Sequence, residues 1–215
     1  MPFDRRLFLN ELGRKAFHLA GCVIPIAYYF FVPRPAMAII LFLCVIGAGF
    51  LEYRRLTGRD LYPTTFMRPS EERRIGGYFY AAVALFLAVL CFDKTVAIAA
   101  MLFLIVGDAL TGLAGAIYFM YSKAKPVDAR ETRSDDLRFV LGHPKPPALV
   151  VLMFLLCMGI GLLFYPALPL RATLVGALGA TVADAFPWRL GPFAIDDNLS
   201  IPLVAGALMT LAALV

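Results

Sequence analysis

Long apolar runs separated by short polar segments make up most of this chain. A helix that crosses a bilayer needs about 20 mostly apolar residues, with about 17 as the lower limit. Seven runs lie near or above that limit. They are Ala16–Val32, Ala36–Leu51, Gly76–Phe92, Thr95–Met120, Ala148–Tyr165, Leu170–Phe186 and Leu199–Val215. The pattern predicts an all-α fold, a polytopic transmembrane helical bundle of about seven spans.

The lysines and arginines alternate between the two sides of such a bundle. All but three of the 20 fall in the N-terminal segment or in the loops after the second, fourth and sixth runs. The three on the opposite side are Arg34, Lys94 and Arg171. Because cytoplasmic loops of membrane proteins carry the excess of Lys and Arg, this distribution predicts a cytoplasmic N-terminus.

The composition supports one membrane-embedded domain over residues 1–215. The chain is 61% hydrophobic and 16% charged, whereas soluble domains are about half apolar and about a quarter charged. Residues 121–147 carry charges of both signs and are predicted to form a cytoplasmic loop within that domain. The net charge of +5 suits membrane topology better than a nucleic-acid partner.

Two polar clusters lie inside or beside the apolar runs. Glu11, Arg14, Lys15 and His18 share one face of the first predicted helix, because their spacing is i, i+3, i+4 and i+7. Such a face suits a phosphate or anionic headgroup, and it also suits a simple positive-inside anchor. Asp108 interrupts the fourth run, with Gly112 and Gly115 at i+4 and i+7. A charged group inside a bilayer is costly, about 2.5–3.5 kcal/mol on insertion scales, which indicates a function for this carboxylate.

A third cluster precedes the last run. Asp196, Asp197 and Asn198 are consecutive, and Asp184 stands at the end of the sixth run. Carboxylate and amide oxygens suit Mg²⁺, a hard cation that takes oxygen ligands. Asn198 is also a candidate helix cap. All three clusters lie on, or can face, the cytoplasmic half, so they predict an enzyme that joins a lipid to a nucleotide phosphate across Mg²⁺.

In four segments the chain resembles the CTP-dependent lipid kinases, the group of dolichol kinase, phytol kinase and CTP-dependent diacylglycerol kinase, which is related to the CDP-diacylglycerol synthases. Glu11–Gly21 is similar to the pattern E-x-x-R-K-x-x-H-x-x-G, and Arg68–Tyr78 to the segment before the third span. Gly107–Gly115 resembles a G-D nucleotide segment. Asp184 with Asp196–Gly206 resembles an acidic residue followed by D-D-N-x-x-x-P-x-x-x-G.

The resemblance implies a kinase that phosphorylates the hydroxyl of a membrane lipid, most simply a polyprenol-type alcohol, with CTP as donor and Mg²⁺ as cofactor. The implied metal ligands are Asp108, Asp196 and Asp197. The implied catalytic residues are Asp108, Asp197, His18 and Lys15. The implied nucleotide-binding residues are Arg14, Gly112, Gly115, Lys145 and Asn198. His18 ranks behind a carboxylate as the base, because a basic neighbourhood disfavours its protonated form.

The chain departs from that family in one segment. Where members carry a K-S-x-E-G-S-like stretch, residues 142–148 read Gly-His-Pro-Lys-Pro-Pro-Ala, so that Lys145 stands in for the lysine and no Glu-Gly follows. Two other functions use similar parts. A cytidylyltransferase would make a CDP-lipid from the same nucleotide, and a membrane transporter would also place acids inside the bilayer.

Overall fold

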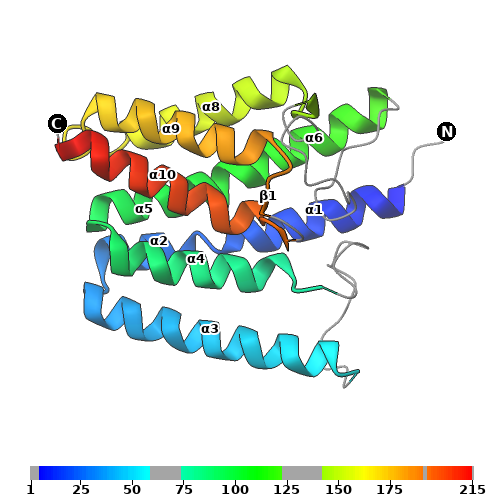
Figure 1. The fold of residues 1–215 in the computed structure, drawn as a ribbon, viewed down its shortest axis with the longest axis horizontal. Coiled ribbons are helices and arrows are strands. Elements are labelled where there is room, and N and C mark those ends of the chain that lie inside the picture. Colours follow the sequence, from blue (N-terminus) through cyan, green and yellow to red (C-terminus); the bar gives the residue numbers. More distant parts are fainter. Residues whose placement is uncertain (1–4, 59–73, 123–141, 191–192, 215) are drawn as a thin grey trace.

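The structure is a computed structural model that describes residues 5–58, 74–122, 142–190 and 193–214. These residues are helical apart from a short hairpin and the connecting turns (Figure 1). The helices are α1 (Arg5–Ala20), α2 (Val23–Phe30), α3 (Arg34–Leu56), α4 (Gly77–Cys91), α5 (Lys94–Leu102), the π-helix η3 (Phe103–Asp108), α6 (Ala109–Ser122), α8 (Pro147–Leu162), α9 (Leu170–Ala185) and α10 (Asp197–Leu214). Strands β1 (Arg189–Leu190) and β2 (Phe193–Ala194) pair in antiparallel fashion.

Each of the predicted apolar runs is helical, but the first is not one continuous helix. It divides into α1 and α2 at Gly21–Cys22, where the amides of both residues bond three residues back, to His18 and Leu19. A Cβ on Gly21 would lie 2.9 Å from the oxygen of His18, so the tight turn depends on glycine there. The prediction of one unbroken helix over Ala16–Val32 is therefore wrong. Alone, the 8 residues of α2 extend only about 12 Å at 1.5 Å per residue.

The fourth run forms one long helix with a π-helical segment in its middle. α5, η3 and α6 follow one another without a break from Lys94 to Ser122. The sharp turn expected at Asp93–Lys94 is confirmed, because α4 ends at Cys91 and α5 begins at Lys94. Segments of π-helix are rare and often occur at functional sites. Here the segment ends on Asp108.

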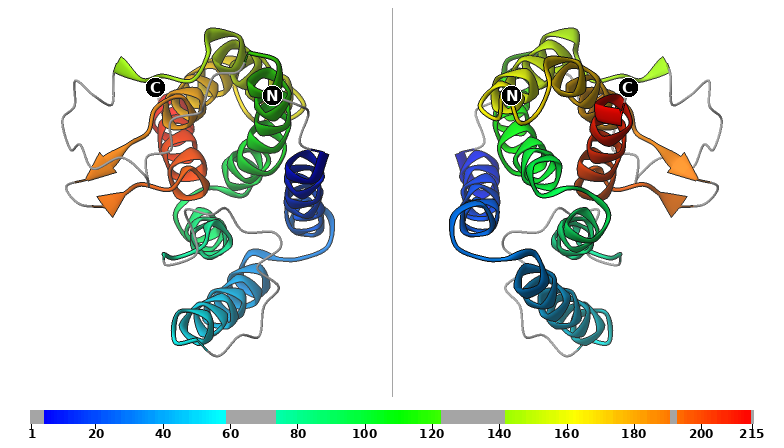
Figure 2. Two further views of the ribbon diagram at one scale, coloured as in Figure 1. Left: turned by 90° about the vertical axis from the view of Figure 1, so that its right-hand side faces the viewer. Right: turned by 90° about the vertical axis from the view of Figure 1, so that its left-hand side faces the viewer.

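The long helix forms the centre of the bundle. Phe103 and Leu104 are fully buried, and η3 contacts α8, α9 and α10. α9 and α10 pack closely beside each other, because Gly176 leaves room for the side chain of Met209. α3 stands at the edge of the bundle and packs on α4 (Figure 2).

The outer surface is apolar in a way that suits lipid. On α9, Leu170, Leu174, Leu178 and Val182 are exposed at four-residue intervals and face away from the core. Within the described residues, three helices are long and apolar enough to cross a membrane, Arg34–Leu56, Lys94–Ser122 and Asp197–Leu214, and two shorter apolar helices accompany them. The fold is thus helical and compatible with a membrane protein, while the count of seven spans and the cytoplasmic N-terminus stay predictions.

Two expected features lie partly outside the described residues. Of the predicted loop 121–147, residues 123–141 are outside, while α6 already includes residues 121 and 122 and α8 begins at Pro147. The segment Arg68–Tyr78 is described only from Arg74 onward.

Candidate functional site

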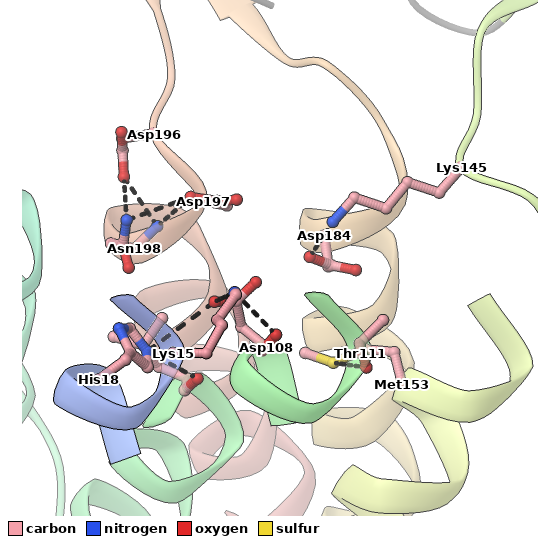
Figure 3. Close-up of polar contacts among 11 residues, drawn as sticks. Lys15, His18, Asp108, Thr111, Lys145, Met153, Asp184, Asp196, Asp197 and Asn198 are labelled. Atoms are coloured by element: carbon pink, nitrogen blue, oxygen red, sulfur yellow. Dashed lines mark hydrogen bonds and ion pairs between the residues drawn. The ribbon is translucent and has the colours of Figure 1, made fainter. Parts of the chain in front are cut away.

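Three carboxylates from three helices converge at one end of the bundle (Figure 3). Asp108 is the last residue of η3, Asp184 lies near the end of α9, and Asp197 is the first residue of α10. One oxygen of each lies within 4.8 Å of the others. Asp108 and Asp184 are buried, while Asp197 is partly exposed. Such a group of acids, buried at the end of apolar helices, is stable only with cations close by.

Lys15 supplies one of these cations. Its Nζ lies 2.8 Å from Oδ2 of Asp108 and donates a second bond to the backbone oxygen of the same residue at 3.1 Å. The side chain is 3% exposed. It reaches Asp108 across Gly112, because a Cβ on Gly112 would overlap Nζ and Cε of Lys15. Gly112, which we expected to contact the nucleotide, therefore provides the passage for Lys15.

Lys145 supplies the second cation. It lies just before α8, and its Nζ is 2.5 Å from Oδ1 of Asp184. Partial burial lowers the pKa of Lys145, but the carboxylates of Asp184, Asp197 and Asp108 raise it by more, so this pKa lies above the ordinary lysine value. The side chain is therefore cationic at neutral pH. The divergent segment 142–148 thus delivers its lysine to the acidic group (Figure 3).

Asp196 and Asn198 form the start of α10. Oδ1 of Asp196 accepts a bond from the Asn198 amide at 3.0 Å, which is the geometry of a helix N-cap, and a second from Asn198 Nδ2 at 2.7 Å. The Asn198 side chain also donates to Oδ1 of Asp197 at 3.2 Å. The cap is therefore Asp196 and not Asn198. In the group of converging acids, Asp184 takes the place that we expected Asp196 to hold.

The remaining predicted residues lie around this centre. His18 Nε2 is 3.3 Å from the backbone oxygen of Leu104 and 3.9 Å from Oδ2 of Asp108. Arg14 is partly exposed next to Lys15 on α1. Gly115 lies against α8, where its Cβ would meet Leu149 at 3.3 Å, so it is a packing position. Glu11 belongs to α1, but its side chain is not among those described.

Another buried acid at this end of the bundle has a structural role. Glu52 on α3 accepts bonds from Arg55 at 2.7 Å and from the Gly76 amide at 3.1 Å. These bonds tie the end of α3 to the start of α4. Glu52 is therefore accounted for by its partners and does not belong with Asp108, Asp184 and Asp197.

The donor set fits Mg²⁺. Mg²⁺ binds oxygen ligands at 2.0–2.1 Å, so two of them lie at most about 4.2 Å apart. The oxygens of Asp108, Asp184 and Asp197, within 4.8 Å of one another, would need to approach by a fraction of an ångström or keep a water between them. Among the described side chains, three carboxylates against the two lysines that contact them leave one negative charge, which favours a divalent cation.

Because Lys15 passes across Gly112, replacing this glycine by alanine should destabilise the protein, whereas the same change inside a helix usually stabilises it. Gly112→Ala is expected to lower the free energy of unfolding by about 1–3 kcal/mol through overpacking, although alanine is about 1 kcal/mol the better helix former. The matched control is Gly159→Ala, because a Cβ at Gly159 meets nothing within 4 Å. Denaturation in detergent measures both variants. Equal stability of the two would contradict the placement of Lys15.

The comparisons with known proteins bear on the whole chain but assign it no activity. No protein-family model matches the chain. No solved structure matches it either. Among curated proteins it is similar to the uncharacterised protein RP860 of Rickettsia prowazekii (strain Madrid E), with 27% identity over 207 residues that cover 90% of each chain. The likeness extends over nearly the full length of both chains, and the relative's name carries no activity.

Proposed function

We propose that this protein is a CTP-dependent kinase that phosphorylates the hydroxyl of a membrane lipid, a polyprenol-type alcohol. The observation that supports this most is the group of Asp108, Asp184 and Asp197, with oxygens within 4.8 Å and two lysines in contact, at the end of apolar helices. Phosphoryl transfer requires positioning and charge neutralisation, which such a group supplies. The choice of CTP and of the alcohol rests on the family resemblance.

The proposed mechanism assigns each residue a task. Asp108, Asp184 and Asp197 would hold Mg²⁺, which when bound neutralises charge on the phosphate oxygens. Lys15 and Lys145 would turn from their carboxylates toward the phosphates and stabilise the charge that develops during transfer. The bond between the γ-phosphorus and its bridging oxygen breaks, and a bond to the lipid oxygen forms. The products are a lipid phosphate, CDP and a proton, which a carboxylate of the group accepts.

The location of the group fits the predicted sidedness. It lies where α9 ends and α10 begins, beside the last turns of α1, on the side of the bundle from which α1 enters and on which α3 ends (Figure 1). The three cations expected on the opposite side begin helices that run toward the group, and two of them have structural partners. Arg34 donates to the backbone oxygens of Val89 and Leu90, and Lys94 lies over the ring of Tyr28. With a cytoplasmic N-terminus, the group would face the nucleotides of the cytoplasm and meet lipid from the bilayer.

Product analysis with labelled nucleotide tests the proposal. Purified protein is incubated with Mg²⁺, a mixture of diacylglycerol, dolichol, phytol and geranylgeraniol, and CTP labelled in either the γ- or the α-phosphate. We expect γ-label in one lipid, CDP in solution and no α-label in lipid. Mass spectrometry then identifies the lipid, and ATP in place of CTP tests the nucleotide.

The alternatives give different results in the same preparation. A cytidylyltransferase transfers the α-label and releases pyrophosphate. A transporter transfers neither label and moves solute into proteoliposomes without nucleotide. Either result would overturn the kinase proposal.

A further inference from the structure

The surroundings of His18 determine which of its nitrogens carries a proton. Nε2 lies 3.3 Å from the backbone oxygen of Leu104 and 3.9 Å from Oδ2 of Asp108. A carbonyl has no hydrogen to donate, and the Asp108 carboxylate already accepts a bond from Lys15 at 2.8 Å. Both neighbours of Nε2 are thus acceptors, so Nε2 must carry a hydrogen.

This assignment limits what His18 can do. A neutral imidazole has one donor nitrogen and one acceptor nitrogen, so when Nε2 donates, the lone pair is on Nδ1. A general base must lie within hydrogen-bond reach of the proton that it removes. The nitrogen that faces Asp108 is the donor and cannot accept that proton. His18 therefore meets the acidic group as a hydrogen-bond donor.

The acceptor of this bond belongs to the segment that carries Asp108. Leu104 and Asp108 are both in the π-helix η3, a rare kind of turn that occurs mostly as a single turn inside an α-helix. Lys15 and His18 are three residues apart on α1, so they share one face. Lys15 bonds to Asp108, and His18 bonds to Leu104 one turn earlier. The face of α1 therefore holds the π-helical turn at two points.

We infer that His18 is a positioning residue, which donates Nε2–H to the Leu104 carbonyl and thereby holds the Asp108 carboxylate beside Asp184 and Asp197. This inference deepens the proposed function and rests on it for the transfer step. It replaces the catalytic role that the sequence suggested for His18. A partner that orients a metal ligand without touching the metal typically changes metal affinity or activity by 10- to 100-fold.

Two substitutions separate a donor from a base. His18→Gln keeps an N–H at nearly the distance of Nε2 and cannot titrate, whereas His18→Leu keeps the bulk and loses the donor. Mn²⁺ affinity is measured by electron paramagnetic resonance in detergent without nucleotide, and initial transfer rates are measured with CTP. We expect His18→Gln to stay within about threefold of the wild type in both, and His18→Leu to lose about tenfold or more in both, mainly in kcat.

His18→Asn is the second variant, because it offers an N–H only near the position of Nδ1. It should lose Mn²⁺ affinity and transfer rate as His18→Leu does, while keeping a polar side chain that helps the protein fold. Phe17→Leu, at an exposed neighbour on α1, is the control and should match the wild type.

The outcomes keep the two proposals apart. If His18→Gln binds Mn²⁺ normally but transfers as poorly as His18→Leu, the ring is the base and the inference is overturned. Wild-type behaviour of His18→Leu in both measurements also overturns it. If the wild type binds Mn²⁺ but transfers no phosphate, the kinase proposal fails. The positioning role then stands when His18→Gln retains the Mn²⁺ affinity that His18→Leu loses.

Discussion

Asp108→Asn is expected to lower phosphate transfer from CTP to lipid by at least about 10³-fold, equivalent to about 4 kcal/mol of transition-state stabilisation. Asp108 connects Lys15 with the other two acids. Lys15 bonds to it at 2.8 Å, and one of its oxygens lies within 4.8 Å of those of Asp184 and Asp197. Asparagine keeps the shape and one acceptor oxygen but removes the charge that would hold Mg²⁺. Transfer of γ-label to lipid at saturating CTP measures the loss.

The same substitution leaves Lys15 buried without its counter-ion, which can cost about 3–5 kcal/mol of stability. The double variant Asp108→Asn/Lys15→Met removes both charges and should fold at least as well as the single variant, yet remain inactive. The matched control is Asp93→Asn, since Asp93 is exposed at the opposite end of the bundle. Size-exclusion chromatography in detergent confirms folding. Wild-type turnover in folded Asp108→Asn would remove Asp108 from the mechanism.

The helices could be predicted from the sequence because their signal is strong. An apolar run near the length of a bilayer span has few alternatives to a helix, since lipid leaves no partner for an unpaired backbone group. Thr95–Met120 corresponds to the long helix from Lys94 to Ser122. Leu170–Phe186 corresponds to α9, which ends one residue earlier, at Ala185.

The departures from regular helix carried no comparable signal. Gly21 ends α1, although glycines elsewhere in the chain, such as Gly159, lie inside helices. The π-helix η3 depends on contacts from α1 and on its packing against α8, where Gly107 leaves room for Met153 and Cys157. These are tertiary contacts between segments far apart in sequence. Periodicity within one segment cannot report them.

The acidic group was only partly predictable for a related reason. Asp196 and Asp197 are adjacent in sequence, so they looked like one pair of ligands. At a helix start, however, the N-cap residue and the first residue of the helix occupy different positions on the backbone. Oδ1 of both residues accepts a bond from the Asn198 amide, but it is Asp197, the first residue of α10, whose carboxylate lies within 4.8 Å of Asp108 and Asp184. The signal for Asp184 was its place as a lone acid at the end of an apolar run.

Lys15→Met is expected to change metal binding and catalysis in opposite directions. In the nucleotide-free site Lys15 neutralises Asp108, so a metal ion has to compete with its charge. Two unit charges about 4 Å apart interact by about 4 kcal/mol in a partly buried environment. This exceeds the 1.4 kcal/mol that corresponds to a tenfold change in affinity. Removing the lysine should therefore strengthen Mn²⁺ binding without nucleotide by about tenfold or more.

The rate of transfer in Lys15→Met should fall by about 10²-fold, because a charge that stabilises the transition state is lost. Mn²⁺ should also raise the denaturation temperature of Lys15→Met more than that of the wild type, since tighter binding to the folded state stabilises it more. Lys94→Met, at the opposite end of the bundle, should leave both quantities unchanged. A parallel loss of Mn²⁺ affinity and rate would mean that Lys15 supports the fold of the site. Opposite changes would mean that Lys15 neutralises Asp108 when no metal is bound and stabilises charge on the phosphates when metal and nucleotide are bound.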